Sequence, residues 1–129
     1  MKAIFTLMIF SSLAFSNISI FISSKNKTVK IDEKELANLY LKKTDTLNGI
    51  KITPIDSKDQ KLYQEFYKKI VKKSPSQLQA YWTRQIFKGD KQPPQRLTKR
   101  EIKHMSKKRR AIITYTKNPL NGKIVLTIK

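Results

Sequence analysis

The segment from Ser74 to Pro94, with the sequence SPSQLQAYWTRQIFKGDKQPP, constrains the fold more than any other part of this chain. Ser74 is a favoured N-cap residue, Pro75 suits the first helical position, and Gln77 can close a capping box. Apolar residues then recur at helical spacing until Gly89 ends the pattern. The expected buried face consists of Leu78, Tyr81, Trp82, which is the only tryptophan, and either Ile86 or Phe87. The segment therefore predicts a capped, half-buried helix, followed by a Pro-containing loop over residues 88–95.

Three further segments begin with capping signals and continue with apolar residues at helical spacing. Their pairs of N-cap and N3 residues are Asp32 with Glu35, Ser57 with Gln60, and Thr98 with Glu101. Helices are therefore expected from residue 32 to about 43, from 57 to about 71, and from 98 to about 107.

Four segments are rich in β-branched and aromatic residues or alternate between apolar and polar residues, which is typical of strands. They cover residues 18–23, 50–55, 111–116 and 123–128. The order strand, helix, strand predicts a right-handed crossover, so the first two strands are expected to pair in parallel. Asn121-Gly122 precedes the last run and predicts a hairpin between the last two strands. The expected fold class is therefore α/β, with a small mixed sheet of about four strands covered by three or four helices.

The N-terminus has the features of a secretory signal. Lys2 precedes the apolar run AIFTLMIFSSLAFS, and Ala14 and Ser16 stand at the −3 and −1 positions of a small-x-small cleavage site. Cleavage after Ser16 would leave a single exported domain of residues 17–129, without an integral membrane span. Apolar character continues through residues 17–22, so an uncleaved membrane anchor is the alternative.

The chain is strongly basic, with a formal net charge of +19 at pH 7. Residues 1–65 hold 10 Lys or Arg and 7 Asp or Glu, whereas residues 66–129 hold 18 and 2, so the second half carries most of the charge. Such a field attracts polyanions. The candidate polyanion contact is the basic run Lys107, Lys108, Arg109 and Arg110. A secretory signal argues against a specific nucleic-acid target and favours an acidic envelope partner or a polyanionic surface, unless the lysines only solvate the domain.

Residue types that enzymes need are scarce in this chain. It has no cysteine, one histidine (His104), and nine scattered carboxylates. Its three glycines lie too far apart for a phosphate-binding loop, and no Gly-x-Ser-x-Gly motif is present. Asp56 and Asp59 lie near a helix start, where they complement the helix dipole. We therefore expect a protein that is not an enzyme and that uses no cofactor and no metal.

Two parts of the chain could bind a small anion. Ser57 and Gln60 begin the second predicted helix, directly after a strand, and free N–H groups at a helix N-terminus favour anions. Ser23 and Ser24 end the first strand and would lie at the same edge of the sheet if the two strands were parallel. Arg84, on the tryptophan-containing helix, would add a guanidinium group. These five residues are the candidate ligand-binding residues.

The tryptophan-centred block also carries a family resemblance. It reads Ser74-Pro75-x-Gln77-Leu78-x-Ala80-Tyr81-Trp82-x-Arg84-x-x-Phe87-x-Gly89, with Pro93-Pro94 after it and Ile52-x-Pro54-Ile55-Asp56 before it. This pattern resembles small periplasmic proteins related to the phosphate-binding proteins of ABC transporters, over essentially the whole chain after the signal. The resemblance implies one lobe of the type-2 periplasmic binding fold and a periplasmic location. It also implies binding of phosphate or another oxyanion, alone or as an accessory to an envelope transport system. The alternative is a cationic envelope protein that docks on an acidic partner or a polyanionic surface.

Overall fold

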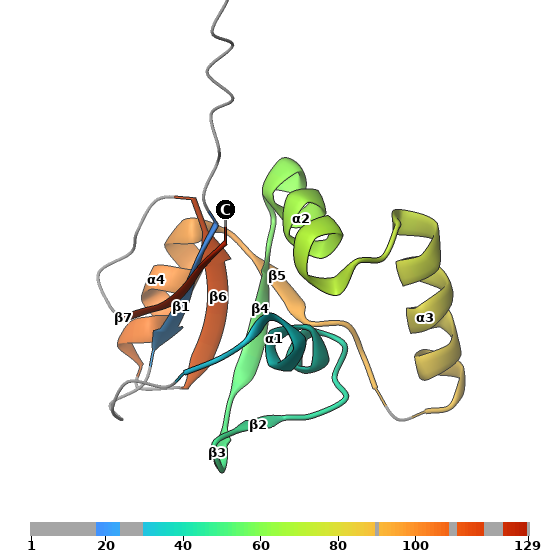
Figure 1. Cartoon of the computed structure of the whole chain (residues 1–129), viewed down its shortest axis with the longest axis horizontal. Coiled ribbons are helices and arrows are strands. Elements are labelled where there is room, and N and C mark those ends of the chain that lie inside the picture. Colours follow the sequence, from blue (N-terminus) through green and yellow to red (C-terminus); the bar gives the residue numbers. More distant parts are fainter. Residues whose placement is uncertain (1–17, 24–29, 90, 109–110, 118–122, 129) are drawn as a thin grey trace, which may run out of the picture.

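The computed structural model describes residues 18–23, 30–89, 91–108, 111–117 and 123–128 (Figure 1). The predicted signal at residues 1–16 and the candidate residues Ser24, Arg109 and Arg110 lie outside the described residues. Within the described ranges, no helix combines the length and apolarity that crossing a membrane requires.

Strands and helices are interspersed along the described chain. The strands are β1 (Ile18–Ser23), β2 (Thr46–Leu47), β3 (Ile50–Lys51), β4 (Thr53–Ser57), β5 (Gln95–Leu97), β6 (Ile112–Thr116) and β7 (Lys123–Ile128). The helices are α1 (Glu33–Tyr40), α2 (Gln60–Phe66), α3 (Pro75–Phe87) and α4 (Lys99–Lys107). A π-helical segment, η1 (Tyr67–Val71), directly continues α2.

Five strands form the central sheet in the order β5-β4-β6-β1-β7, and β2 and β3 form a separate two-stranded ribbon. β4 pairs in parallel with β5 and with β6, whereas β1 pairs antiparallel with β6 and with β7. The sheet is therefore mixed, and the predicted α/β fold class is confirmed.

Two predicted strand pairings were wrong. β1 does not pair with β4, because β6 lies between them and β1 and β4 run in opposite directions. β6 and β7 do not form a hairpin, because β1 lies between them as well. β1 is buried along nearly its whole length, with Ile18, Ile20 and Ile22 in the core on one face of the sheet and Phe21 in the core on the other. Such a strand buries most surface in the middle of a sheet, and this gain outweighs the local connection rules.

The strand β5 was not predicted. β5 pairs with the end of β4, where Ser57 lies opposite Leu97. For this part of the chain, the sequence predicts only a loop over residues 88–95 and a helix that begins at Thr98. Strand β5 is only three residues long and follows Pro93-Pro94, so alternation within it is too short to recognise.

The helix starts were predicted more accurately than the pairings. Ser74 and Thr98 cap α3 and α4 in reciprocal capping boxes, and Asp32 caps α1 by accepting from the backbone N–H of Glu35. The prediction that Ser57 caps α2 was wrong. Asp59 is the N-cap, and its carboxylate accepts from the backbone N–H groups of residues 61 and 62. Ser57 remains in β4 because it pairs with β5.

Two cores lie on the two faces of the sheet. One face packs against α4 through Phe21, Ile55, Leu97, Ile102 and Ile112. The other face packs against α1, α2 and η1, with residues such as Ile20, Tyr40, Phe66 and Tyr115 in its core, and buried residues of α3 extend this core on its outer side. Side chains alternate along a strand, and Ile55 points to the α4 face. Its neighbour Asp56 therefore belongs to the face that α1, α2 and η1 cover.

Helix α3 lies beyond α2 and away from the sheet (Figure 1). Leu78, Tyr81 and Trp82 are buried as predicted, and the Tyr81 hydroxyl donates to the backbone oxygen of Leu41 at 2.6 Å. The prediction that Ile86 or Phe87 completes the buried face was wrong, since Ile86 is 55% exposed and Phe87 is 92% exposed.

Candidate functional site

The candidate site lies at the edge of the sheet where the parallel strands β5, β4 and β6 end. Carboxyl ends of parallel strands meet at one edge, and ligands commonly bind there. Asp56 and Tyr115 lie near the ends of β4 and β6, and Arg96 lies in β5 beside them. The segment α2–η1 covers this edge and connects it to α3 (Figure 1).

Asp56 is the central polar residue of this edge and is only 2% exposed. Its Oδ2 accepts a hydrogen bond from the Tyr67 hydroxyl at 2.7 Å, and its Oδ1 accepts one from the Tyr115 hydroxyl at 2.9 Å. Burial raises the pKa of Asp56 from 3.8 to about 7, although the two hydroxyls and the positive charges of Arg96 and Lys42 oppose the rise. A carboxyl group on the surface is almost fully ionised near pH 7, so Asp56 is unusual in titrating near neutrality.

The tyrosines around Asp56 are held as hydrogen-bond donors. Burial and the charge of Asp56 raise the pKa of Tyr67 and of Tyr115 well above the usual value, so both hydroxyls stay protonated. The ring of Tyr115 stacks on Phe66, with centroids 3.8 Å apart and planes 3° apart. Stacking on Phe66 and hydrogen bonding to Asp56 together fix the ring of Tyr115 in position.

Tyr40 joins β4 to β6 beside this cluster. The parallel ladder between these strands reaches Pro54, which has no backbone N–H to donate. The Tyr40 hydroxyl lies 2.9 Å from the backbone oxygen of Ile55 and 3.1 Å from that of Ile113, one on each strand. A side chain of α1 therefore supplies the polar contact where the ladder stops.

Arg96 links β5 to the start of α2. Its Nε donates to the backbone oxygen of Ser57 at 2.9 Å, and one terminal nitrogen donates to Oε1 of Gln60 at 3.0 Å. Its guanidinium carbon lies 4.0 Å from the centroid of the Tyr63 ring. The guanidinium is thus held by two hydrogen bonds and a cation–π contact.

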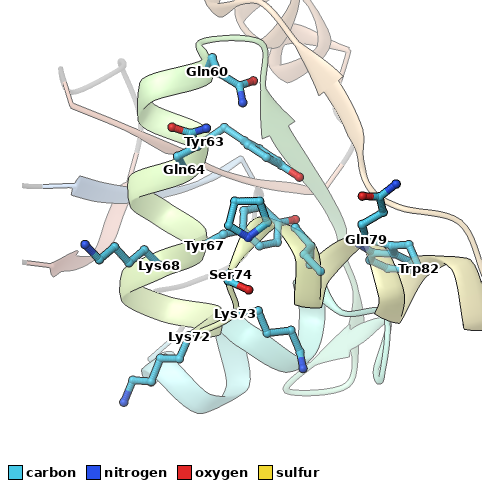
Figure 2. Close-up of a pocket in the computed structure, with 12 residues that line it drawn as sticks. Gln60, Tyr63, Gln64, Tyr67, Lys68, Lys72, Lys73, Ser74, Gln79 and Trp82 are labelled. Carbon is cyan, nitrogen blue, oxygen red and sulfur yellow. The ribbon is translucent and has the colours of Figure 1, made fainter.

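A cavity of about 720 Å³ adjoins this cluster, between α2–η1 and α3. Figure 2 shows Tyr63 and Tyr67 on the α2–η1 side, Trp82 on the α3 side, and Lys72 and Lys73 near the end of η1. Tyr67 connects the cavity to the buried cluster, because its ring lines the cavity while its hydroxyl binds Asp56. Figure 2 also shows Gln60 at the opposite end from the two lysines.

The structure brings together only part of the predicted ligand-binding set. Ser57 and Gln60 lie close together, both bound by Arg96. Ser23 lies at the opposite end of the sheet, where its hydroxyl donates to the backbone oxygen of Ser106 at 3.2 Å. The prediction that Ser23 shares an edge with Ser57 was wrong, because β1 runs opposite to β4. Arg84 is exposed on α3 and does not line the cavity.

The backbone donors expected at Ser57 are already engaged. The N–H of Ser57 donates to the Tyr115 hydroxyl at 3.2 Å, and Ser57 Oγ accepts from the N–H of Asp59 at 3.0 Å. The backbone N–H groups of residues 61 and 62, in the first turn of α2, donate to the Asp59 carboxylate. The chain therefore supplies its own anion at this helix N-terminus.

Lys107 and Lys108, the described residues of the basic run, lie at the end of α4, which covers the other face of the sheet. Lys107 and Lys108 are exposed there. His104, on the same helix, is also exposed and has no role in the cavity. Among the described residues, no group of three or more His, Asp or Glu side chains could hold a metal ion.

Sequence reasoning missed most of the buried cluster. The sequence position of Asp56 predicts only a residue that complements a helix dipole, and the sequence analysis assigns no role to Tyr67 or Tyr115. The alternation in β4 contained a usable signal, because it places Asp56 and Pro54 on the face opposite Ile55. No comparable signal identifies Arg96, whose role depends on the unpredicted strand β5. A comparison of this chain with protein-family models, curated proteins and solved structures finds no match.

Proposed function

We propose that this chain is an exported, non-enzymatic binding domain that takes a phosphate-bearing or other oxyanionic solute in the cavity between α2–η1 and α3. The observation that carries this proposal is the charge of the cavity lining. Three lysines, Lys68, Lys72 and Lys73, line it, and no described lining residue is a carboxylate. Cations at a partly enclosed cavity attract anions more strongly than cations in open water.

The buried cluster supports binding rather than catalysis. Asp56 titrates near neutrality, yet it is 2% exposed and tyrosine hydroxyls occupy both of its oxygens. A general acid or base must reach the proton that it transfers. Asp56 is therefore suited to fixing Tyr67 in the cavity wall and not to exchanging protons with a bound solute.

The sequence resemblance supports the same role. The mixed α/β architecture is compatible with a small single-lobe binding fold. Under this proposal the domain works in the periplasm, where it binds the solute itself or serves as an accessory to an envelope transport system.

Titration calorimetry of the purified protein with inorganic phosphate, sulfate and methylphosphonate tests the proposal. We expect saturable binding of at least one of these anions at submillimolar to millimolar concentration. Because the lysines supply the charge, Lys72→Gln/Lys73→Gln should weaken binding at least fivefold.

The matched control removes the same charge from another surface. Lys103→Gln/Lys107→Gln takes two positive charges from the exposed side of α4 and leaves the cavity lining intact. This variant should bind within about twofold of the wild type. Equal weakening in both double variants, or no saturable signal with any of the anions, would reject the proposal.

A second function is favoured by the surface of α4. Only Ile102 in this helix is buried, and its exposed residues are mainly cationic. The exposed cations are Lys99, Arg100, Lys103, Lys107 and the following Lys108, and Glu101 and His104 are exposed beside them. A cationic helix face of this kind can dock on an acidic partner or a polyanionic surface.

Binding to vesicles with and without anionic lipid distinguishes the second function from the first. Docking through α4 should be lost in Lys103→Gln/Lys107→Gln, retained in Lys72→Gln/Lys73→Gln, and should collapse when the salt is raised from 50 to 500 mM. Vesicle binding that changes neither with salt concentration nor with the α4 substitutions would contradict the second function.

A further inference from the structure

The cavity between α2–η1 and α3 is much larger than an inorganic oxyanion. A tetrahedral oxyanion occupies the volume of two or three water molecules, roughly 60–90 Å³. The cavity measures about 720 Å³, within the range that holds organic ligands. Phosphate alone would therefore leave most of the cavity to water.

The walls of the cavity are aromatic and aliphatic on both sides. Tyr63 and Tyr67 stand on the α2–η1 side, with ring centroids 4.7 Å apart. On the α3 side stand Pro75, Leu78 and Trp82, and Trp82 is held edge-on against Tyr81. Tyr67 is fixed by its bond to Asp56, and Tyr63 is fixed by the guanidinium of Arg96. Rigid aromatic walls of this kind bind flat apolar groups with little loss of side-chain entropy.

The polar groups of the cavity are separated along its length. Lys72 and Lys73 lie near the end of η1, and the Lys73 ammonium is 5.6 Å from the centroid of the Tyr81 ring. Side-chain amides of Gln60, Gln64 and Gln79 line other parts of the cavity (Figure 2). A ligand that matched this arrangement would have a charged group at the lysine end and an apolar body between the helices.

We infer that the solute is an amphipathic anion, in which a flat aromatic ring carries the phosphate, phosphonate or similar oxyanionic group. This inference rests on the proposed function and narrows its ligand class. The ring lies between the Tyr63–Tyr67 wall and the wall formed by Leu78 and Trp82. The anionic group lies at Lys72 and Lys73.

Four probes separate the contributions of ring and charge. Methylphosphonate has the anionic group without a ring, phenylphosphonate has both, cyclohexylphosphonate has an apolar ring that is not flat, and benzyl alcohol has a flat ring without the charge. Calorimetry should show that phenylphosphonate binds at least tenfold more tightly than methylphosphonate and at least threefold more tightly than cyclohexylphosphonate. Benzyl alcohol should bind at least tenfold more weakly than phenylphosphonate.

Trp82 gives an independent readout because it is the only tryptophan and lines the cavity. Its fluorescence should change saturably with phenylphosphonate, with the same dissociation constant as calorimetry, and much less with methylphosphonate. An aromatic probe that binds without altering the Trp82 emission would contradict the assigned position of the ring.

A substitution that fills the cavity tests the position without removing a core side chain. Gln79 is exposed and lines the cavity, so Gln79→Phe should weaken phenylphosphonate at least tenfold and methylphosphonate less than threefold. The matched control is Ala80→Phe, which adds a similar ring to an exposed position of α3 outside this cavity. Thermal melts of both variants report whether the fold is kept.

The outcomes distinguish this inference from the proposed function. If phenylphosphonate and methylphosphonate bind equally and Gln79→Phe affects neither, the aromatic ligand class is overturned while anion binding stands. If phosphate or sulfate binds but neither phosphonate does, the aromatic ligand class is likewise overturned while anion binding stands. If none of these anions binds, the proposed function fails and the inference fails with it.

Discussion

The Tyr67 hydroxyl donates a hydrogen bond to Oδ2 of Asp56 over 2.7 Å, which joins the wall of the cavity to the buried edge of the sheet. Tyr67 belongs to the π-helical segment η1, and Asp56 is the penultimate residue of β4. The bond therefore positions a ring of the candidate site through a residue that no solute reaches. The state of Asp56 should consequently affect both the stability of the fold and the order of the cavity.

Asp56→Asn should change the pH dependence of stability. The pKa of Asp56 is raised from 3.8 to about 7 by burial, so the folded state binds more protons than the unfolded state between these values. Its contribution is fully present below pH 3.8 and is lost as the pH rises through about 7. The free energy of unfolding of wild type minus that of Asp56→Asn should fall by roughly 2–4 kcal/mol between pH 4.5 and 8. Urea unfolding across this range measures the difference.

Asp59→Asn is the matched control for the loss of one negative charge near α2. Asparagine is about as good an N-cap as aspartate, so the helix start is preserved. A pH profile for Asp56→Asn that runs parallel to the wild type would contradict the assigned titration of Asp56.

Tyr67→Phe should destabilise the fold more at pH 8 than at pH 5. The substitution leaves Oδ2 of Asp56 without this donor, and hydrogen bonds to a charged group contribute about 1.5–3 kcal/mol. At pH 5 the carboxyl is mostly neutral, and the loss should be smaller. Tyr63→Phe alters the same cavity wall but keeps both hydrogen bonds of Asp56, so its effect should not depend on pH. Equal losses for Tyr67→Phe at the two pH values would refute the link.

Lys72→Gly should separate stability from binding. Lys72 and Lys42 both have φ of 57°, in the left-handed region that disfavours a side chain. Replacement of either by glycine should stabilise the fold by about 0.5–1.5 kcal/mol, after the entropic cost of glycine is subtracted. Of these two lysines, Lys72 lines the cavity and Lys42 does not, so Lys72→Gly should weaken oxyanion binding by a few fold and Lys42→Gly should leave it unchanged. Equal binding by the two glycine variants would show that the Lys72 charge does not contribute.

Arg96→Lys should loosen the contact between β5 and α2. Lysine cannot reproduce the two hydrogen bonds to Ser57 and Gln60 together with the contact on the Tyr63 ring. We expect a loss of about 1–2 kcal/mol in the free energy of unfolding and faster hydrogen exchange at the N–H of Lys58, which bonds to the backbone oxygen of Leu97. Unchanged exchange at Lys58 would indicate that β5 is held without Arg96.

Local signals predicted the helices of this fold well. Ser74 and Thr98 start α3 and α4 because each capping box is complete within four residues. The prediction of a helix start failed where a strand distant in the sequence pairs with the same segment. Ser57 has a suitable hydroxyl for a cap, but its pairing with Leu97 extends β4 and moves the helix start to Asp59.

The strand order and the candidate site depend on contacts that sequence spacing does not contain. β1 lies between β6 and β7, which come from the far end of the chain. The two donors of Asp56 are 11 and 59 residues away from it in sequence. Nothing in the sequence spacing indicates that the hydroxyls of Tyr67 and Tyr115 meet one carboxylate, because only the folded sheet brings them together.

The most direct measurement of the central claim is a titration of the ¹⁵N-labelled protein with phenylphosphonate, followed by NMR of its backbone amides. The account predicts saturable shifts concentrated along residues 60–82, on both sides of the cavity, and their loss in Lys72→Gln/Lys73→Gln. Shifts concentrated on residues 99–108 of α4, or no saturable shifts at millimolar ligand, would contradict it.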